Sequence, residues 1–393
     1  MAVETTLVIN PGSASRKYAL AKKGRILLRG HFEVQDGEAV VTFYDARGSK
    51  AQQRVSSHAF AKTTDLFIAE AIARGIIASL KDITVVGLRI VAPGTDFQKS
   101  KRITPSYIKR LARVARVAPL HINPELKELR HIQKLLPRAA RFAISDSAFH
   151  VTLPDVARRF TIPEVDAEKY DLYKFGYHGI SVASVVKQSK RVFGSRPKHL
   201  VVCHLGSGSS VTAVKDGRSI DTTMGYSPLA GLAMATRVGD IDPGVLLALA
   251  KYKRFSLEQL SDYLNKRTGL LGLSGQTDDM KTLVERRKHG APQATFAVEA
   301  YAHRVCKAIG ASAATLGGLD AIVFTATIGE RSWRLRSIIC RQLAGLGVEF
   351  DVAKNRHKKD TGMITTPRSK VKVAVIETDE LAELVRQTAA LSA

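Results

Sequence analysis

Two stretches of this chain, about half its length apart, repeat one pattern of apolar runs and turns rich in glycine and serine. The first reads LVINPGSASRKYALAKKGR from Leu7, and the second reads VVCHLGSGSSVTAVKDGR from Val201. At an offset of 194 residues the matching pairs are Gly12 with Gly206, Ser13 with Ser207, Ser15 with Ser209 and Ala19 with Ala213. Each stretch is typical of a strand, a turn, a second strand and a second turn. We infer an internal duplication.

The remainder of each half predicts a mixed α/β fold. Residues 63–80 and 295–316 carry helical patterns, whereas residues 83–94 and 319–329 are typical of β-rich runs that meet a glycine. Such alternation indicates the α/β class. Because a single core rarely exceeds about 300 residues, we expect two similar domains that face one another across a cleft. A polar segment after SDSAFHVTLP places their boundary near residue 150.

Cysteine content and hydropathy indicate a protein of the reducing cytoplasm. The three cysteines, Cys203, Cys306 and Cys340, are odd in number and form no CxxC pair, which argues against a disulfide framework or a thiolate metal site. No run approaches the roughly 18 apolar residues of a membrane helix. The segment MAVETTLVIN lacks a basic region before its short apolar run, so we expect neither export nor membrane binding.

The formal net charge of +24 comes from basic clusters distributed along the chain. Such a charge is typical of nucleic-acid-binding proteins. However, the clusters lack interleaved aromatic residues, aromatic content is 6%, and no zinc-finger or RNP pattern occurs. We therefore do not expect nucleic-acid binding to be the main role. The alternative is a solvated basic surface that attracts anionic substrates.

The two glycine-rich turns are candidates for phosphate binding. Without a Cβ, glycine lets backbone N–H groups approach a phosphate, and hydroxyls and cations complete the site. Neither turn matches the Walker pattern or a GxGxxG fingerprint, so P-loop and Rossmann folds lack support. For each turn the structural alternative is a simple β-hairpin.

Two arginines are candidates for binding an anion. Arg237 lies in TRVGDID beside two carboxylates, where it either holds a planar substrate anion or forms a surface ion pair. Arg89 lies inside the apolar run LRIVAPG, where a buried guanidinium needs an anionic partner, from the protein or from a ligand.

An aspartate and a histidine complete the candidates. Asp146 follows the apolar RFAI, which predicts a carboxylate at a strand end, either for a metal ion or as a helix cap. His178, in FGYHG, is either a core histidine or a donor to a charged transition state. No HExxH or GxSxG pattern supports a hydrolase.

In order, VINPGSASRK, APLH, SDSAFHVTLP, YHGIS, the stretch from His204 to Pro243 and NKRTGLLGLSG resemble motifs of the acetate kinase family. The resemblance covers roughly residues 5–385. It implies the duplicated actin-like (ribonuclease H-like) core of the sugar kinase/Hsp70/actin superfamily. The implied N-terminal domain is residues 1–150, on which residues 380–393 pack, and the implied nucleotide-binding domain is residues 151–379.

The resemblance also implies an activity and partners. The reaction is ATP plus acetate giving ADP plus acetyl phosphate by direct in-line transfer, with Mg²⁺ as cofactor, Mn²⁺ as its alternative, and a homodimer as the assembly. A carboxylate is already nucleophilic, so catalysis reduces to alignment and charge neutralisation. Acetyl phosphate links this activity to acetyl-CoA biosynthesis.

Matched positions imply roles for individual residues. The catalytic groups would be Arg89, Asp146, His178 and Arg237. The carboxylate substrate would be bound by Arg89, Val91, Leu120, His121, Tyr177 and Pro228. Phosphate and nucleotide would be bound by Asn10, Ser13, Ser15, Lys17, His204, Leu205, Gly206, Ser207, Gly208, Asp279, Met280, Lys281, Thr327, Ile328, Gly329, Glu330 and Arg331. Mg²⁺ would be held by Asn10, Asp146 and Glu380.

Departures from the family pattern cluster around the nucleotide. TATIGER has Ala326 and Thr327 where the family has glycines, so side chains are expected to protrude there. Near the acyl site, Tyr177 replaces Phe and adds a hydroxyl to the expected pocket wall. The alternatives are therefore a propionate or butyrate kinase, or a relative that uses another phosphoryl donor such as pyrophosphate. A sensor or polyanion binder without enzyme activity is the alternative of a different class.

Overall fold

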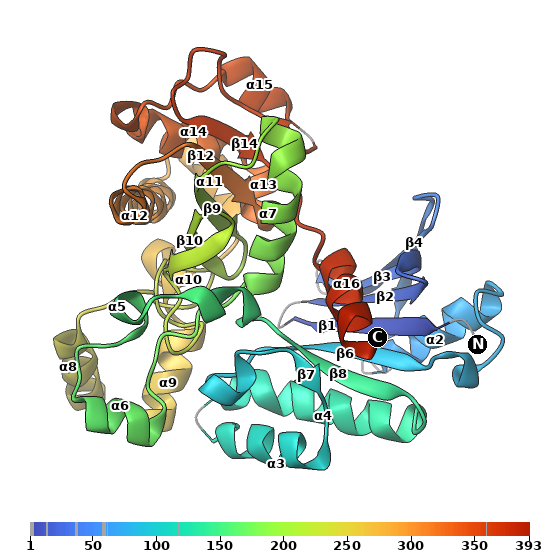
Figure 1. The fold of residues 1–393 in the computed structure, drawn as a ribbon. Helices are drawn as coiled ribbons and strands as arrows, with labels where there is room; N and C mark the ends of the chain where they lie inside the picture. The colour runs from blue at the N-terminus through green and yellow to red at the C-terminus, as the bar shows by residue number, and fades with distance from the viewer. Residues whose placement is uncertain are drawn as a thin grey trace. The chain divides into compact units, whose positions relative to one another are not determined.

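The computed structural model describes residues 4–12, 15–35, 38–56, 60, 62–116, 118–358 and 360–393. The chain divides into two compact units (Figure 1). Unit 1 comprises Met1–Ala148 and Asp379–Ala393, and unit 2 comprises Phe149–Thr378.

Unit 1 is built on an eight-stranded mixed sheet in the order β5-β4-β3-β2-β1-β6-β8-β7. The strands are β1 (Thr5–Pro11), β2 (Ser15–Lys22), β3 (Arg25–Gln35), β4 (Glu38–Asp45), β5 (Lys50–Val55), β6 (Val85–Ile90), β7 (Lys101–Arg102) and β8 (Ala140–Ser145). The helices are α2 (Thr63–Ala73), α3 (Pro105–Val114), α4 (Pro119–Leu135) and α16 (Glu380–Ser392), with short 3₁₀ turns η1 (Leu80–Asp82) and η2 (Thr95–Phe97).

Strand periodicity decides which side chains of unit 1 face which layer. Alternate residues of β6, including Leu88, join a core with α2, α3 and α4. The residues between them face α16, which packs on β1, β6 and β8 although it lies at the far end of the sequence (Figure 1). A Cβ at Gly87 would lie 2.0 Å from Thr388 Oγ1 of α16, so this glycine permits the close approach of the helix.

Unit 2 is built on a six-stranded sheet in the order β11-β10-β9-β12-β14-β13. The strands are β9 (His199–Leu205), β10 (Ser209–Lys215), β11 (Arg218–Thr222), β12 (Ala321–Thr325), β13 (Gly362–Met363) and β14 (Lys372–Val375). The helices are α5 (Asp155–Arg158), α6 (Glu164–Tyr170), α7 (Gly179–Phe193), α8 (Pro243–Lys253), α9 (Leu257–Lys266), α10 (Gly269–Ser274), α11 (Met280–Lys288), α12 (Pro292–Leu316), α13 (Ala326–Arg331), α14 (Trp333–Gln342) and α15 (Val352–His357). The 3₁₀ turn η3 spans Ala148–Thr152, and η4 spans Ala344–Leu346.

Both sheets share one connectivity. In unit 1, β1 pairs antiparallel with β2 and parallel with β6, and β6 pairs parallel with β8. In unit 2, β9 pairs antiparallel with β10 and parallel with β12, and β12 pairs parallel with β14. Each sheet also ends in a short antiparallel strand, β7 or β13. The internal duplication predicted from the repeated turns is therefore present in the strand order.

The second turn of each repeat is confirmed as a tight hairpin. Lys23 and Gly24 join β2 to β3 with φ of 48° and 73°, and Asp216 and Gly217 join β10 to β11 with φ of 49° and 81°. Positive φ at both central positions is the geometry of a type I′ turn, which matches the twist of the flanking strands.

Two predicted elements are shorter than expected. The helix predicted for residues 63–80 ends at Ala73, because Gly75, with φ of 66°, closes its last turn. The β-rich run predicted for residues 319–329 is a strand only to Thr325, after which the chain turns into α13. None of the described helices has the length and apolar character needed to cross a membrane.

Candidate active site

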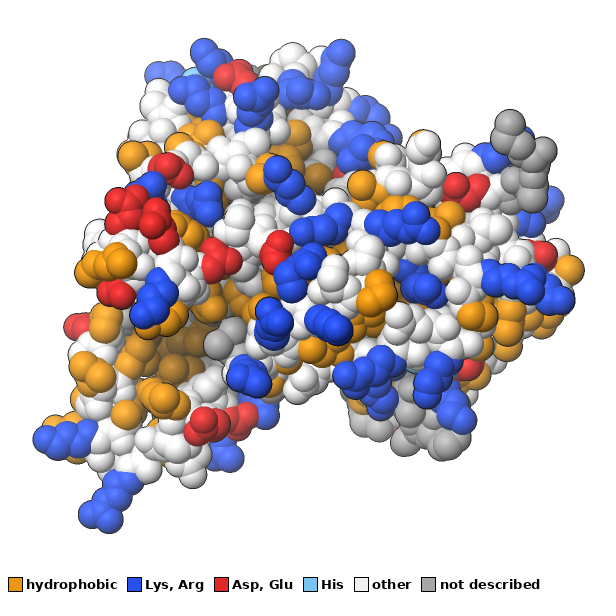
Figure 2. All heavy atoms as spheres, turned by 60° about the horizontal axis from the view of Figure 1, so that its bottom comes forward, with side chains coloured by type: hydrophobic (Ala, Val, Ile, Leu, Met, Phe, Trp, Pro, Cys, Tyr) orange, Lys and Arg blue, Asp and Glu red, His pale blue; other side chains and the backbone are white. Residues whose placement is uncertain are grey.

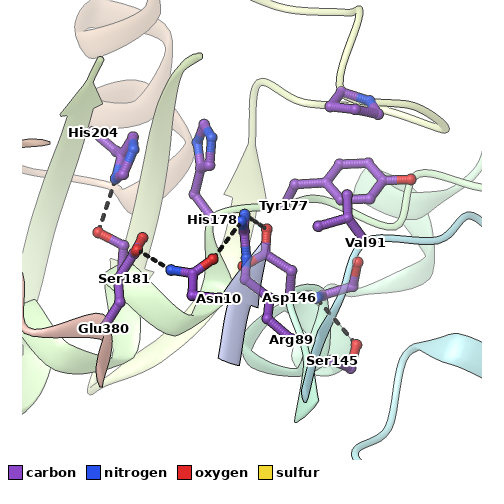
Figure 3. Close-up of polar contacts among 12 residues, drawn as sticks. Asn10, Arg89, Val91, Ser145, Asp146, Tyr177, His178, Ser181, His204 and Glu380 are labelled. Carbon is purple, nitrogen blue, oxygen red and sulfur yellow. Dashed lines mark hydrogen bonds and ion pairs between the residues drawn. The ribbon is translucent and has the colours of Figure 1, made fainter. Parts of the chain in front are cut away.

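Four polar side chains of unit 1 form a continuous hydrogen-bonded chain (Figure 3). Asn10 Nδ2 donates to Glu380 Oε2 at 2.8 Å, and Arg89 Nη1 donates to Asn10 Oδ1 at 3.1 Å. Arg89 Nε and Nη2 donate to the two carboxylate oxygens of Asp146 at 3.0 and 2.9 Å. The chain thus connects two carboxylates through an amide and a guanidinium.

Each of these side chains is positioned by an element of the sheet or by the helix that covers it. Asn10 lies in β1, Arg89 lies in β6, and Asp146 directly follows β8, as the sequence predicted for a strand end. Glu380 is the first residue of α16. Parallel pairing of β1 with β6 and of β6 with β8 brings the carboxyl ends of these strands to one edge. Such an edge is where open α/β sheets bind their ligands.

The Arg89 guanidinium is charged and largely enclosed. Its side chain is 13% exposed, and that of Asp146 is fully buried. Burial alone lowers the pKa of Arg89, but the carboxylates of Asp146, Glu380 and Glu125 raise it above its ordinary value. Arg89 therefore stays a cation in unit 1.

Glu125, which the sequence reasoning did not single out, is a second buried acid of this region. Its Oε1 accepts a hydrogen bond from the Val91 N–H at 2.8 Å, whereas its Oε2 has no partner in the described part of the chain. Burial raises the pKa of the Glu125 carboxyl well above its ordinary value, against the Val91 N–H and the Arg89 charge, which lower it. Glu125 lies in α4, where its helical position predicts burial but not this contact.

Only some of the other predicted site residues of unit 1 lie in the described part of the structure. Ser15 and Lys17 lie at the start of β2, half-buried, and Lys17 pairs across the ladder with Asn10. Ser13 lies outside the described residues. Leu120 and His121 lie in the first turn of α4, but their side chains are outside the described part of the structure.

In unit 2, two histidines stack against each other. The rings of His178 and His204 have centroids 4.0 Å apart and planes 22° apart. His178 Nδ1 lies 3.0 Å from Ser210 Oγ, and His204 Nδ1 lies 2.8 Å from Ser181 Oγ. Both side chains are thus fixed by hydroxyls of β10 and α7.

Gly208 of the second glycine-rich turn lies close to two of the predicted donors. A Cβ built on it would lie 2.6 Å from Arg237 Nη2 and 3.1 Å from His178 Nε2. Any side chain at this position would therefore displace both groups. Arg237 is held from the other side by its Nη1, which donates to the Pro228 carbonyl at 2.7 Å. The structure brings Arg237, His178, Pro228 and Gly208 together within unit 2.

The Tyr177 hydroxyl, which the resemblance placed in the wall of the substrate pocket, has a hydrogen-bond acceptor within unit 2. Tyr177 is 1% exposed, and its hydroxyl donates to the Tyr226 carbonyl at 2.7 Å. Its proton is therefore used inside unit 2. Because buried hydroxyls need partners, the tyrosine is accommodated by the fold of this unit.

The TATIGER segment forms α13, which holds five predicted nucleotide residues: Thr327, Ile328, Gly329, Glu330 and Arg331. The Glu330 Oε1 accepts from the N–H groups of Ala326 and Thr378, at 2.9 and 3.2 Å. The expected protrusion is found at Thr327, which is exposed, but not at Ala326, which is 9% exposed and adopts φ of 63°. The glycine of the family pattern suits this left-handed backbone.

Arg336, another residue that the sequence reasoning missed, holds α13 from beneath. It is 1% exposed, and its Nη1 donates to the carbonyls of Gly329 and Glu330 at 2.8 and 2.6 Å. Its Nε donates to Asn355 Oδ1 at 2.8 Å. Burial lowers the pKa of Arg336 to about 10. An arginine two turns beyond a motif gives no sequence signal for this contact.

Four other predicted nucleotide residues differ in how accessible their side chains are. Leu205 and Met280 are buried in the core of unit 2, which leaves only their backbone groups for a ligand. Asp279 caps α11 by accepting from the Lys281 N–H at 3.2 Å. Ser207 is exposed between Gly206 and Gly208.

The hydrogen-bonded residues Asn10, Asp146 and Glu380 of unit 1 fit a Mg²⁺ ion that takes its other ligands from waters and phosphates. Among the described residues there is no group of three or more His, Cys, Asp or Glu side chains that could hold a metal. Mg²⁺ at nucleotide sites, however, is usually held by one or two carboxylates, with waters and phosphates as the other ligands. Asp146 and Glu380 supply two carboxylates, and Asn10, bonded to Arg89 and Glu380, supplies an amide oxygen.

Comparisons with known proteins agree with this geometry. The model of the acetokinase family matches residues 5–386, which is nearly the whole chain. The chain belongs to the acetokinase family. The resemblance seen in the motifs is therefore confirmed, and so is the predicted α/β fold of two duplicated halves.

This chain is similar to known members of the family over nearly the full length of both proteins. The acetate kinase of Carboxydothermus hydrogenoformans is 38% identical over 392 residues, which cover 97% of this chain and 98% of the relative. The acetate kinase of Dictyoglomus thermophilum is 37% identical over 390 residues, with coverage of 97% and 98%. The crystal structure of Porphyromonas gingivalis acetate kinase has a TM-score of 0.84 at 32% identity, covering 99% of this chain and all of the other. A propionate kinase from Francisella tularensis subsp. tularensis has a TM-score of 0.86 at 31% identity, with the same coverage.

Proposed function

We propose that this acetokinase-family chain is a short-chain carboxylate kinase that converts ATP and acetate into ADP and acetyl phosphate. The observation that carries the proposal is the partly buried hydrogen-bonded chain from Glu380 through Asn10 and Arg89 to Asp146. It fixes the Arg89 cation beside two carboxylates, and phosphoryl transfer to an anion depends on positioned cations that neutralise the developing charge. Membership of the family supports the same activity.

The proposed mechanism rests on alignment rather than on a strong base. The carboxylate oxygen of acetate is already nucleophilic, so no proton has to be removed before it attacks the γ-phosphate in line. We assign Arg237 and His178 as donors to the transferring phosphoryl group, since both approach Gly208 of the second turn. Arg89, which lies in unit 1, would neutralise negative charge on the transferring phosphoryl group. His204 would keep the His178 ring in place through their stacked contact.

Mg²⁺ is the proposed cofactor, with Asn10, Asp146 and Glu380 as the residues that would hold it. The metal, when bound, neutralises charge on the nucleotide phosphates. Unit 1 itself contributes the orientation of these groups, because Arg89 bonds both Asp146 and Asn10. Lys17, opposite Asn10 in the ladder, and Ser15 are proposed contacts to phosphate.

In unit 2, the proposed nucleotide contacts lie in the turn from Gly206 to Gly208, in α13, and at the start of α11. Of the two residues that stand where the family pattern has glycines, Ala326 is buried and Thr327 is exposed. The choice of phosphoryl donor is therefore the property that we expect these substitutions to affect. Acetate is the first proposed acceptor and propionate the second, since one methylene changes discrimination by only about 1–3 kcal/mol.

The proposed activity is tested by trapping acyl phosphate as a hydroxamate. Acetate, propionate and butyrate are each combined with ATP, GTP and pyrophosphate in the presence of Mg²⁺ or Mn²⁺. We expect the highest rate with acetate and ATP. If acyl phosphate forms with pyrophosphate but not with ATP or GTP, pyrophosphate replaces ATP as the proposed donor. If no pair gives acyl phosphate, the result favours a relative without enzyme activity.

We also propose that the protein is a homodimer that associates through unit 2. The helix α8 has the apolar sequence PGVLLALAKYK but no buried residue. Its Leu247 and Tyr252 are 74% and 84% exposed, and Val156 of α5 is 94% exposed. Figure 2 shows hydrophobic side chains gathered at the left side, where α5, α6 and α8 lie in Figure 1. Large exposed apolar patches of this kind mark protein interfaces.

Sedimentation tests the proposed assembly. We expect the wild-type chain to sediment as a dimer and Leu247→Glu to shift it toward a monomer at the same concentration. Val34→Glu, at a residue of unit 1 that is 56% exposed, is the matched control and should remain dimeric. A monomeric wild type, or a dimer unaffected by Leu247→Glu, would contradict the proposed interface.

A further inference from the structure

Positive charge is concentrated in one segment of unit 1. Residues 99–141 contain twelve lysines and arginines but only two acidic residues, Glu125 and Glu128. The whole chain has 60 basic and 36 acidic residues. About two fifths of the net charge of +24 therefore lies in about one ninth of the chain. This distribution differs from a uniformly basic surface.

The two helices of this segment display their cations as parallel stripes. On α3 the exposed cations are Lys109, Arg113 and Arg116, the last just beyond the helix; on and after α4 they are Lys127, Arg130, Lys134 and Arg138. Spacings of three and four residues place side chains on one face of a helix. The opposite faces of both helices are buried in the core of unit 1. We name these seven side chains the basic face.

The helices that carry the basic face lie side by side. α3 packs directly against α4, as Figure 1 also shows. Arg116 and Arg138 lie just beyond the helix ends. Within the helices, Lys109 and Arg113 of α3 and Lys127, Arg130 and Lys134 of α4 recur every three or four residues, which corresponds to a rise of about 4.5–6 Å. That spacing is close to the separation of successive phosphates along a nucleic acid strand.

The cations of the basic face are not neutralised within the fold. In the described residues, none of the seven forms an ion pair; the neighbouring Arg110 and Lys101 both pair with Asp96. Of the two acids in the segment, Glu125 is buried, and Glu128 accepts a hydrogen bond from Thr64. Figure 2, in which the bottom of Figure 1 comes forward, shows many Lys and Arg side chains and few Asp or Glu on this side.

The chemistry of the surrounding surface restricts the class of partner. Among the described residues from 99 to 141 there is no exposed large hydrophobic or aromatic side chain. Lipid-binding helices place such residues beside their cations. Protein interfaces have an apolar or aromatic centre, and single-stranded nucleic acid is bound on aromatic platforms. A duplex backbone requires only regularly placed cations.

We propose that the basic face binds duplex nucleic acid through its phosphates, without reading the base sequence. The proposal revises the expectation from sequence, in which nucleic-acid binding was not the expected main role because aromatic residues and known motifs were absent. Those features serve single strands and specific bases, whereas the seven cations of α3 and α4 suit a duplex backbone. The proposed binding is separate from the kinase activity, because no residue of the basic face belongs to the candidate active site.

The test measures binding of the full chain to a fluorescein-labelled 24-base-pair DNA duplex by fluorescence anisotropy at several salt concentrations. If all seven cations contact phosphates, the slope of log K against log[salt] is about −6. The triple variant Arg113→Glu, Arg130→Glu, Lys134→Glu removes three contacts. Its slope is expected to rise to about −3.6, the value for the four remaining contacts, with binding at least about tenfold weaker.

A second triple variant with the same charge change controls for net charge. Lys187→Glu, Lys190→Glu and Lys215→Glu alter exposed cations of unit 2, and this variant should bind the duplex within about twofold of wild type. Melting temperature and hydroxamate formation, measured on both variants, establish that each is folded.

Four results would overturn the proposal. The first is equal weakening by both triple variants, which would assign binding to net charge. The second is tighter binding to vesicles of phosphatidylserine and phosphatidylcholine than to the duplex. The third is displacement of the duplex by linear polyphosphate at equal phosphate concentration. A scrambled duplex should compete as well as the labelled sequence, and failure to compete would exclude binding without base readout.

Discussion

Arg89 binds both carboxylate oxygens of Asp146, from Nε at 3.0 Å and from Nη2 at 2.9 Å, and has a third nitrogen bonded to Asn10. Three contacts to two partners fix the guanidinium plane at the end of β6. Only arginine offers this fork, because lysine carries a single nitrogen. The orientation of the proposed metal-binding residues therefore depends on the identity of this side chain.

Arg89→Lys is expected to lower the rate of acetyl phosphate formation by roughly 10²–10³ although the charge is kept. The single nitrogen of lysine cannot take the three positions from which Arg89 Nε, Nη1 and Nη2 donate, so the carboxylate loses its fixed orientation. Steady-state kinetics check the rate. Arg54→Lys is the control, because the Arg54–Glu38 pair is exposed and worth at most about 1 kcal/mol. A rate for Arg89→Lys within tenfold of the wild-type rate would show that catalysis does not require the guanidinium geometry of Arg89.

Arg237→Ala is expected to lower kcat on the order of 10³, because it deletes a donor placed at the second glycine-rich turn. The measurement is kcat in the hydroxamate assay at saturating acetate and ATP. Arg218→Ala, at an exposed residue of β11, is the matched control and should leave kcat unchanged. A loss below tenfold in Arg237→Ala would exclude the proposed role.

Glu125→Gln is expected to stabilise the protein more at pH 8 than at pH 5. Burial raises the pKa of Glu125 in the folded state, so its contribution to stability is complete below the ordinary pKa and is lost as pH rises through the raised value. Glutamine keeps an acceptor for the Val91 N–H but carries no charge. Urea unfolding at both pH values measures the difference. A difference that does not change with pH would mean that Glu125 has an ordinary pKa.

Local pattern was enough to predict several parts of the site. Arg89 was expected inside an apolar strand and lies in β6, and Asp146 was expected at a strand end and follows β8. The second turn of each repeated stretch was expected from its pattern, and at Asp216 and Gly217 it adopts the positive φ values of a tight hairpin. In each case the information is contained in a few consecutive residues.

Contacts between distant parts of the chain could not be predicted from local pattern. Glu380 bonds Asn10 across 370 positions in the sequence, and only the family resemblance indicated it. The buried contacts of Glu125 and Arg336 were missed, because burial of a charged residue depends on which helix covers it. The Tyr177 hydroxyl donates to the Tyr226 carbonyl, a partner 49 positions away that local pattern did not indicate.

Ala326→Gly is expected to stabilise the protein by about 0.5–1 kcal/mol. Ala326 adopts φ of 63°, which costs a residue with a Cβ about 1–2 kcal/mol, and glycine removes this strain at some cost in chain entropy. Urea unfolding measures the change. In the control Ala321→Gly, in the regular strand β12, the same substitution should destabilise by about 1 kcal/mol. Equal destabilisation by both changes would show that Ala326 is not strained.

Arg336→Met is expected to weaken nucleotide binding, because Arg336 supports α13 through its carbonyl groups. The variant leaves the carbonyls of Gly329 and Glu330 without their donor and lowers the free energy of unfolding by about 3 kcal/mol. Because the segment that carries Thr327 is then less fixed, KM for ATP should rise on the order of tenfold, with a smaller change in kcat. Initial rates at varied ATP measure both constants. Arg341→Met, at an exposed residue of the same helix α14, should leave KM unchanged. If Arg336→Met loses stability but keeps the KM for ATP, Arg336 supports the fold without positioning the nucleotide segment.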